Sequence, residues 1–146
     1  MTTAREIMTA SPVIVDISET ATAIAQRLDA DDIGAVIVCS QDRHLQGMVT
    51  DRDLAIQVIA GGRDPSTTTA SELVSGREVV TIGADDSLEE AMKTMKKHAV
   101  RRLPVIDGTD VIGIVSQADL ALHANETQVG ELLEVISGAP DNSGRG

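Results

Sequence analysis

Hydrophobic residues along the chain follow two periods, one typical of strands and one typical of amphipathic helices. Runs rich in β-branched residues predict strands at 13–15, 35–39, 45–49, 79–82, 102–106 and 111–115. A helix face with apolar residues spaced i, i+3, i+4, i+7 is predicted at Ala21, Ile24, Ala25 and Leu28. The same spacing returns at Leu88, Ala91, Met92 and Met95.

The two halves of the chain are copies of one another. Residues 3–8 resemble residues 69–74, and residues 47–55 resemble residues 113–121 at the same offset. Such a repeat indicates that one supersecondary unit occurs twice. Each copy is interpreted as β-α-β-β-α, with hairpin turns at 42–44 and 107–110 and second helices that start near Asp53 and Asp119.

The sequence therefore predicts an α/β (α+β) fold in which two repeats pack sheet to sheet with pseudo-two-fold symmetry. We expect repeat 1 at residues 1–62, a linker at 63–70, repeat 2 with a final helix at 71–136 and a flexible tail at 137–146. A half of about 60 residues is only marginally stable by itself. The halves should therefore bury apolar surface against each other, with two related clefts between them.

Composition and charge exclude several classes of partner. The 146 residues include 12 Lys and Arg against 23 Asp and Glu, and the net charge of −11 repels nucleic acids and anionic membranes. The chain has no Phe, Tyr or Trp on which a base could stack. No apolar run approaches a membrane span, and the N-terminus lacks the apolar core of a signal peptide. We expect a cytoplasmic protein that binds neither nucleic acid nor membrane.

Cysteine and histidine offer little chemistry. The single cysteine, Cys39, cannot form an intrachain disulfide and is interpreted as a small core residue, with a thiol that joins two subunits as the alternative. His44, His98 and His123 fall on different predicted elements, so no metal site is expected. No motif pairs a nucleophile with a base, so the chain is not expected to be an enzyme.

One polar pattern occurs in both repeats, where a strand passes into a helix. Thr50 and Asp53 in the first copy correspond to Ser116 and Asp119 in the second. Such a junction favours an anion such as phosphate, and a carboxylate can accept both hydroxyl groups of a ribose. The same residue types also cap a helix without any ligand. From the residues alone, both interpretations stay open.

The duplicated Gly-h-h-Thr/Ser-x-x-Asp signature, together with Arg-Arg-Leu-Pro-Val-Ile-Asp at 101–107, resembles the CBS domain family in its tandem form. The chain looks especially like the stand-alone two-CBS proteins of actinobacteria, of the hypoxic response protein type. The resemblance covers residues 3 to about 124. It implies a homodimer whose clefts bind an adenosine-containing ligand such as AMP, ADP, ATP, S-adenosylmethionine or NAD, with no required cofactor.

The resemblance also implies roles for individual residues. It places ribose-binding carboxylates at Asp53 and Asp119, and phosphate-side hydroxyls at Thr50 and Ser116. Adenine is expected beside apolar residues near the first strand of each repeat, at Val13, Ile14, Val79 and Val80.

Two arginines distinguish the second copy from the first. Arg102 matches an arginine that contacts phosphate in some family members, and Arg101 stands beside it, whereas the first copy has Gly34 and Ala35 there. A phosphate in an acidic protein needs local positive charge. The two clefts are therefore not expected to be equivalent, and a phosphorylated ligand is expected to favour the one reached by these arginines.

The leading hypothesis is a non-enzymatic sensor that passes a ligand-dependent change to an unknown protein partner through its dimer surface. The alternative is a ligand-free dimeric stress-response or interaction module, in which Thr50, Asp53, Ser116 and Asp119 only cap helices.

Overall fold

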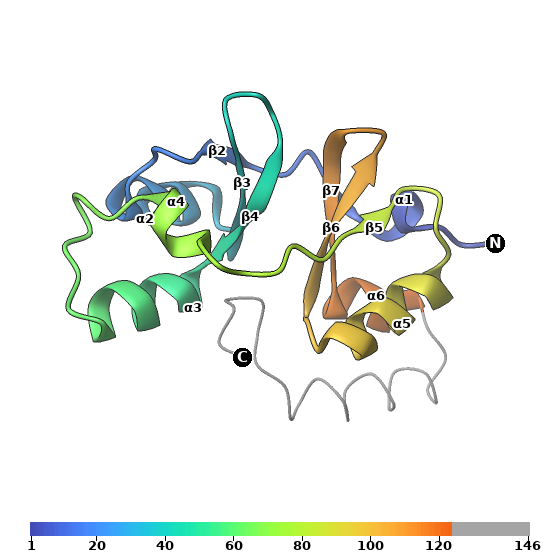
Figure 1. The fold of residues 1–146 in the computed structure, drawn as a ribbon. Coiled ribbons are helices and arrows are strands. Elements are labelled where there is room, and N and C mark those ends of the chain that lie inside the picture. The colour runs from blue at the N-terminus through green and yellow to red at the C-terminus, as the bar shows by residue number, and fades with distance from the viewer. Residues whose placement is uncertain (124–146) are drawn as a thin grey trace. The chain divides into compact units, whose positions relative to one another are not determined.

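The computed structural model describes residues 1–123 (Figure 1), so the helix and tail expected at 129–136 and 137–146 lie outside the described residues. The helices are α1 (Ala4–Ile7), α2 (Ala21–Asp31), α3 (Asp51–Asp53), the π-helix η1 (Leu54–Ala60), α4 (Ala70–Val74), α5 (Leu88–His98) and α6 (Gln117–His123). The strands are β1 (Thr9–Ala10), β2 (Ile14–Asp16), β3 (Ala35–Cys39), β4 (Leu45–Thr50), β5 (Ile82–Gly83), β6 (Arg102–Asp107) and β7 (Asp110–Ser116).

Two compact units divide the chain, each with its own sheet. Residues 13–79 form one unit, hereafter the middle unit, with sheet order β2-β3-β4. Residues 1–12 and the chain from residue 80 onward form the other, hereafter the split unit, with sheet order β1-β7-β6-β5. In both units a parallel pair is followed by an antiparallel hairpin, because β2 and β5 run parallel to β3 and β6. The expected mixture of helices and strands is confirmed.

The compact units do not coincide with the sequence repeats. The first residues of the chain join the sheet of the second repeat, since Thr9 pairs with Ile114 and Ala10 pairs with Gly113. In turn, α4 of the second repeat joins the first, where the backbone N–H of Ala70 donates to the carbonyl of Glu19 at 2.8 Å. The expected division at 1–62, 63–70 and 71–136 therefore differs from these units, because the two copies exchange their leading segments.

The glycine of the repeated signature explains how the exchanged segments fit. A Cβ on Gly113 would lie 2.9 Å from the carbonyl oxygen of Thr9 and would collide with the side chain of Met8. A Cβ on Gly47 would lie 3.2 Å from the side chain of Val74. Met8 and Val74 are equivalent positions in the two copies. Glycine is thus favoured at the two positions where the chain at the end of α1 or α4 packs on a strand, which are Gly113 in β7 and Gly47 in β4.

Each unit also has its own apolar core. In the middle unit the buried face of α2 packs on β3 and β4, through Ala21, Ile24, Leu28, Val36, Val38 and Val49. In the split unit the buried face of α5 packs on β6 and β7, through Leu88, Ala91, Met92, Met95, Leu103, Val105 and Val115. The two predicted helix faces are confirmed except at Ala25, which is exposed at the edge of its stripe.

The helix boundaries follow local capping chemistry. The side-chain oxygens of Thr20 and Ser87 accept hydrogen bonds from the backbone N–H groups of Ala23 and Glu90, at 3.2 and 3.1 Å.

The strand predicted at 79–82 shortens to Ile82–Gly83, because the chain passes from the middle unit to the split unit between residues 79 and 80. Among residues 1–123 no helix is long and apolar enough to span a membrane.

Candidate functional site at the two strand-to-helix junctions

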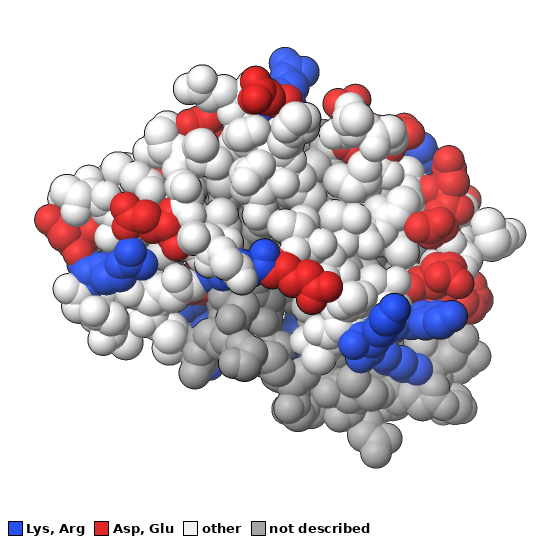
Figure 2. Space-filling view, viewed as in Figure 1, with Lys and Arg blue, Asp and Glu red and all other residues white. Residues whose placement is uncertain are grey.

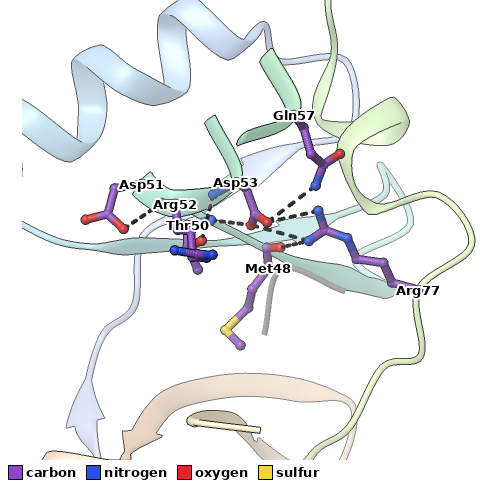
Figure 3. A network of polar contacts seen from close by, with 7 residues as sticks. All are labelled: Met48, Thr50, Asp51, Arg52, Asp53, Gln57 and Arg77. Carbon is purple, nitrogen blue, oxygen red and sulfur yellow. Dashed lines mark hydrogen bonds and ion pairs between the residues drawn. The ribbon is translucent and has the colours of Figure 1, made fainter. Parts of the chain in front are cut away.

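The first junction joins β4 to α3 and is closed by a reciprocal capping box. The hydroxyl oxygen of Thr50 accepts a hydrogen bond from the backbone N–H of Asp53 at 3.1 Å. In return, Oδ2 of Asp53 accepts one from the backbone N–H of Thr50 at 2.7 Å (Figure 3). The two residues are 1% and 0% exposed. The first predicted hydroxyl and carboxylate therefore cap a helix, as one of the two open interpretations holds.

Arg77 occupies the remaining acceptor positions of this carboxylate. Its Nη2 donates to Oδ1 of Asp53 at 3.0 Å, and its Nη1 donates to Oδ2 at 3.3 Å. The same Nη1 lies 3.2 Å from the carbonyl oxygen of Met48, and Nε2 of Gln57 donates to Oδ1 of Asp53 at 3.4 Å. Figure 3 shows the guanidinium directed at the carboxylate from the segment that follows α4. Both oxygens of Asp53 are thus engaged in a buried ion pair.

Arg77 was not among the predicted site residues. It lies 24 positions from Asp53 along the chain, so no local motif connects the two. Aligned by the repeat, position 77 corresponds to Ser11. Other aligned positions, such as Pro12 and Glu78, also differ in charge, so the sequence alone does not single out Arg77.

The second junction, between β7 and α6, has the same capping pattern with a less occupied carboxylate. Oδ2 of Asp119 accepts from the backbone N–H and the hydroxyl of Ser116, at 2.8 and 3.0 Å. The hydroxyl oxygen of Ser116 accepts from the N–H of Asp119 at 3.1 Å. Both residues are only half-buried. Within residues 1–123, no hydrogen bond or ion pair reaches Oδ1 of Asp119.

The two predicted arginines lie in the same unit as this second junction. Arg102 begins β6 and pairs in register with Ser116, and the backbone N–H of Gln117 donates to the carbonyl of Arg101 at 2.9 Å. Arg101 is exposed and Arg102 is half-buried. The structure therefore places the cationic pair on the strand next to Ser116, in the split unit.

The predicted adenine contacts are divided between the units. Val13, Ile14 and Val79 belong to the middle unit with Asp53, whereas Val80 belongs to the split unit with Asp119. Ile14 and Val79 are 47% and 42% exposed. Val13 and Val80 are half-buried and pack against the cores of their respective units.

The helices after the two junctions also differ. The helix predicted to start near Asp53 is a three-residue α-helix followed by the π-helix η1, which ends at Ala60 and is capped by Gly61. A Cβ on Gly61 would collide with the carbonyl oxygen of Gln57, so glycine is needed at this end. After Ser116 the chain forms the ordinary α-helix α6.

The charged and metal-ligating side chains of residues 1–123 are the other candidates for a site. On the face seen in Figure 2, Lys and Arg side chains lie in small groups next to Asp and Glu and do not form one basic surface. In the part of the chain that the structure describes, no three His, Cys, Asp or Glu residues are grouped to hold a metal ion. Cys39 is buried and free, and this burial raises the pKa of its thiol.

Comparison with known proteins identifies the family. A model described as the CBS domain matches the chain twice, at residues 4–59 and 70–126. Hypoxic response protein 1 of Mycobacterium tuberculosis is 43% identical over 136 residues, which cover 93% of this chain and 94% of that protein. The CBS domain-containing protein YhcV of Bacillus subtilis is 37% identical over 139 residues, covering 94% of this chain and 96% of that protein.

Solved structures agree with these relatives. Hypoxic Response Protein I with two coordinated zinc ions has a TM-score of 0.74 and 44% identity, and the match covers 85% of this chain and all of that one. A CBS-domain protein from Burkholderia ambifaria has a TM-score of 0.71 and 29% identity, covering 84% of this chain and 93% of that one. The resemblance found from the repeated signature is thereby confirmed. This chain belongs to the CBS domain family and contains two copies of the domain.

Proposed function

We propose that the chain is a non-enzymatic regulatory module that binds an adenosine-containing ligand, and that Ser116 and Asp119 recognise the ribose. One observation carries this proposal: Oδ1 of Asp119 makes no hydrogen bond with residues 1–123, and its side chain is half-buried. A carboxylate oxygen has two lone pairs, so Oδ1 can accept hydrogen bonds from ribose hydroxyl groups while Oδ2 stays in the cap.

The neighbouring arginines support a phosphorylated form of the ligand. Arg101 lies directly before β6. Arg102 is the first residue of β6 and pairs in register with Ser116. A guanidinium matches phosphate geometry and remains charged at every physiological pH. In a chain with a net charge of −11, these side chains provide the local positive charge that an anionic ligand needs. Among the four predicted adenine contacts, Val80 belongs to the same unit as Asp119, Arg101 and Arg102.

Signalling to a partner would follow from a difference in affinity between two conformations. The name of the similar mycobacterial protein, hypoxic response protein 1, favours a role in a stress response. Ile59 and Leu122 are 79% and 80% exposed but belong to different units, and single exposed side chains do not form an apolar patch, so the proposed homodimer rests on the resemblance.

A second function is favoured by the capping geometry itself. Both carboxylates accept hydrogen bonds from backbone N–H groups of their own junctions, at Thr50 and Ser116. A module of this kind would be a ligand-free dimer that acts through protein contacts alone. It differs from the first proposal in one measurable property, which is the binding of a ribonucleotide.

Titration calorimetry with AMP, ADP, ATP, S-adenosylmethionine and NAD separates these two functions. We expect D119N to weaken binding at least tenfold, or by about 1.4 kcal/mol, since it removes the charged acceptor. D110N is the matched control, because Asp110 is an exposed carboxylate at the start of β7, the strand that ends at Ser116. Equal affinities for D119N and D110N would overturn the ribose assignment, and no binding of any of the five ligands would favour the ligand-free module.

A further inference from the structure

The two copies treat their equivalent carboxylates differently, and one residue accounts for the difference. In the middle unit, Arg77 follows α4 and pairs with both oxygens of Asp53. In the split unit the position after α1 is held by Ser11, an exposed residue whose backbone N–H donates to the carbonyl of Ile112 at 3.2 Å. The aligned positions thus differ in charge and also in local backbone, since Ser11 follows β1, whereas Arg77 follows a turn after α4 and its backbone N–H donates to the carbonyl of Val74.

The ion pair in the middle unit is well protected from exchange with a ligand. The side chain of Arg77 is 11% exposed and that of Asp53 is 0% exposed. Two donors of one guanidinium meet two oxygens of one carboxylate, which is the stronger and more specific form of such a pair. The carbonyl of Met48 holds the same Nη1 from a third side.

A ribose would have to displace Arg77 to reach this carboxylate. Its hydroxyl groups would replace charge-assisted hydrogen bonds with neutral donors, and they would leave a buried guanidinium without its partner. Both changes oppose binding. No such exchange is needed at Asp119, because Ser11 brings no positive charge to that unit.

We propose that Arg77 is an internal occupant of the first repeat's carboxylate and that it restricts ribose recognition to the second repeat. This inference rests on the proposed function for the part that concerns a ligand. It adds a specificity-determining residue, and it assigns one ribonucleotide to each chain where the duplicated signature would suggest two.

The stoichiometry of AMP binding tests the inference directly. The parent chain should bind one AMP, and R77S, which installs the residue of the other copy, should bind a second. R77S/D119N should retain the new site and R77S/D53N should lose it. R63S is the matched control, since Arg63 forms an exposed ion pair with Glu72 in the same unit and its loss should leave one site.

The reverse substitution tests the same idea without disturbing a buried pair. S11R places a guanidinium at the position aligned with Arg77, which in this copy directly follows β1, and should lower the affinity for adenosine and for AMP about tenfold. Adenosine is included because it has no phosphate that the new arginine could attract. S11A should bind both compounds as the parent does.

A ligand-independent measurement covers the ion pair itself. Thermal unfolding of the parent, R77S, D53N and R77S/D53N forms a double-mutant cycle. The double variant should be more stable than R77S alone, because it removes the buried charge that R77S leaves without a partner. Additive losses would show that Arg77 and Asp53 do not depend on each other, and would overturn the inference.

The outcomes separate the inference from the proposed function. If the parent binds one AMP, and R77S gains no site and S11R loses no affinity, Arg77 is not the restricting residue although the proposed function stands. If the parent binds none but R77S binds one that D53N removes, the ribose assignment at Asp119 is wrong, and only the part of the inference by which Arg77 closes the carboxylate of Asp53 holds. If neither protein binds AMP, ADP, ATP, S-adenosylmethionine or NAD, both are wrong, since no ligand recognition exists for Arg77 to restrict.

Discussion

Replacing Gly113 with alanine should loosen the exchanged leading segment from the split unit. The new Cβ would lie 2.9 Å from the carbonyl oxygen of Thr9 and would collide with the side chain of Met8. Met8 has a flexible side chain that can move aside. The carbonyl belongs to the backbone of β1, so relief there requires the strand itself to shift.

The size of the effect follows from what β1 contributes. Its register with β7 has two residue pairs, Thr9 with Ile114 and Ala10 with Gly113. Each backbone hydrogen bond contributes about 0.5–1.5 kcal/mol net, and overpacking of this kind costs about 1–3 kcal/mol. We therefore expect G113A to lower the free energy of unfolding by about 1–3 kcal/mol. For a chain of this size, that corresponds to a fall in Tm of roughly 3–10 °C.

Circular dichroism is the suitable assay, because the chain has no Trp or Tyr for intrinsic fluorescence. Thermal and urea unfolding of the parent, G113A, M8A and G113A/M8A would show how much of the loss comes from the Met8 side chain. G47A should lose stability for a different reason, since Gly47 has a φ of 154° that an L side chain rarely adopts, in addition to the side chain of Val74 at 3.2 Å. A value for G113A within about 0.5 kcal/mol of the parent would refute the reasoning, because it would mean that residues 8–10 do not rest on Gly113.

Two further predictions concern titratable groups. Burial raises the pKa of the Cys39 thiol above its value of about 8.5 in the unfolded chain. Burial of the neutral thiol therefore contributes its full share to the free energy of unfolding below that unfolded pKa. The contribution should decline as the pH rises through the pKa of the folded state. Thiol labelling at pH 8.5 should accordingly be slow in the native chain and fast in urea, and equal rates would contradict this burial. The side chain and backbone N–H of Ser66 donate to Asp64 and hold the pKa of its carboxyl below its usual value. These hydrogen bonds stabilise the folded chain above the pKa of Asp64 in the unfolded chain, and the stabilisation is lost as the pH falls through the pKa of the folded state. S66A should raise the Asp64 pKa in an NMR titration, whereas S75A, at an exposed serine of the same unit, should leave it unchanged.

The candidate site shows how far local patterns reach. The spacing of a hydroxyl and a carboxylate three residues later located both junctions, because a helix N-cap depends only on neighbouring residues. That spacing could not decide between a cap and a ligand site. The decision came from Arg77, which meets Asp53 across 24 positions of sequence, and from the half-exposed position of Asp119.

The expected domain division shows the same limit. Residues 3–8 and 69–74 are so alike that either segment could complete either sheet by the criteria of periodicity and composition. The structure pairs each with the other copy, and contacts at Gly113 and Gly47 provide the fit. No local signal distinguishes an exchanged segment from one that stays with its own repeat.

The amino-acid sequence alone determined the duplication, the β-α-β-β-α order within each copy, the hairpins and the capped junctions, because these follow from periodicity and from hydrogen bonds between near neighbours, whereas α1, β1 and α4 were not predicted. Tertiary structure decided which leading helix completes which sheet, and it decided that the carboxylate of Asp53 is buried against Arg77 while that of Asp119 is not. The physical reason is that burial and ion pairing depend on distances between residues remote in sequence, and only the folded chain sets those distances.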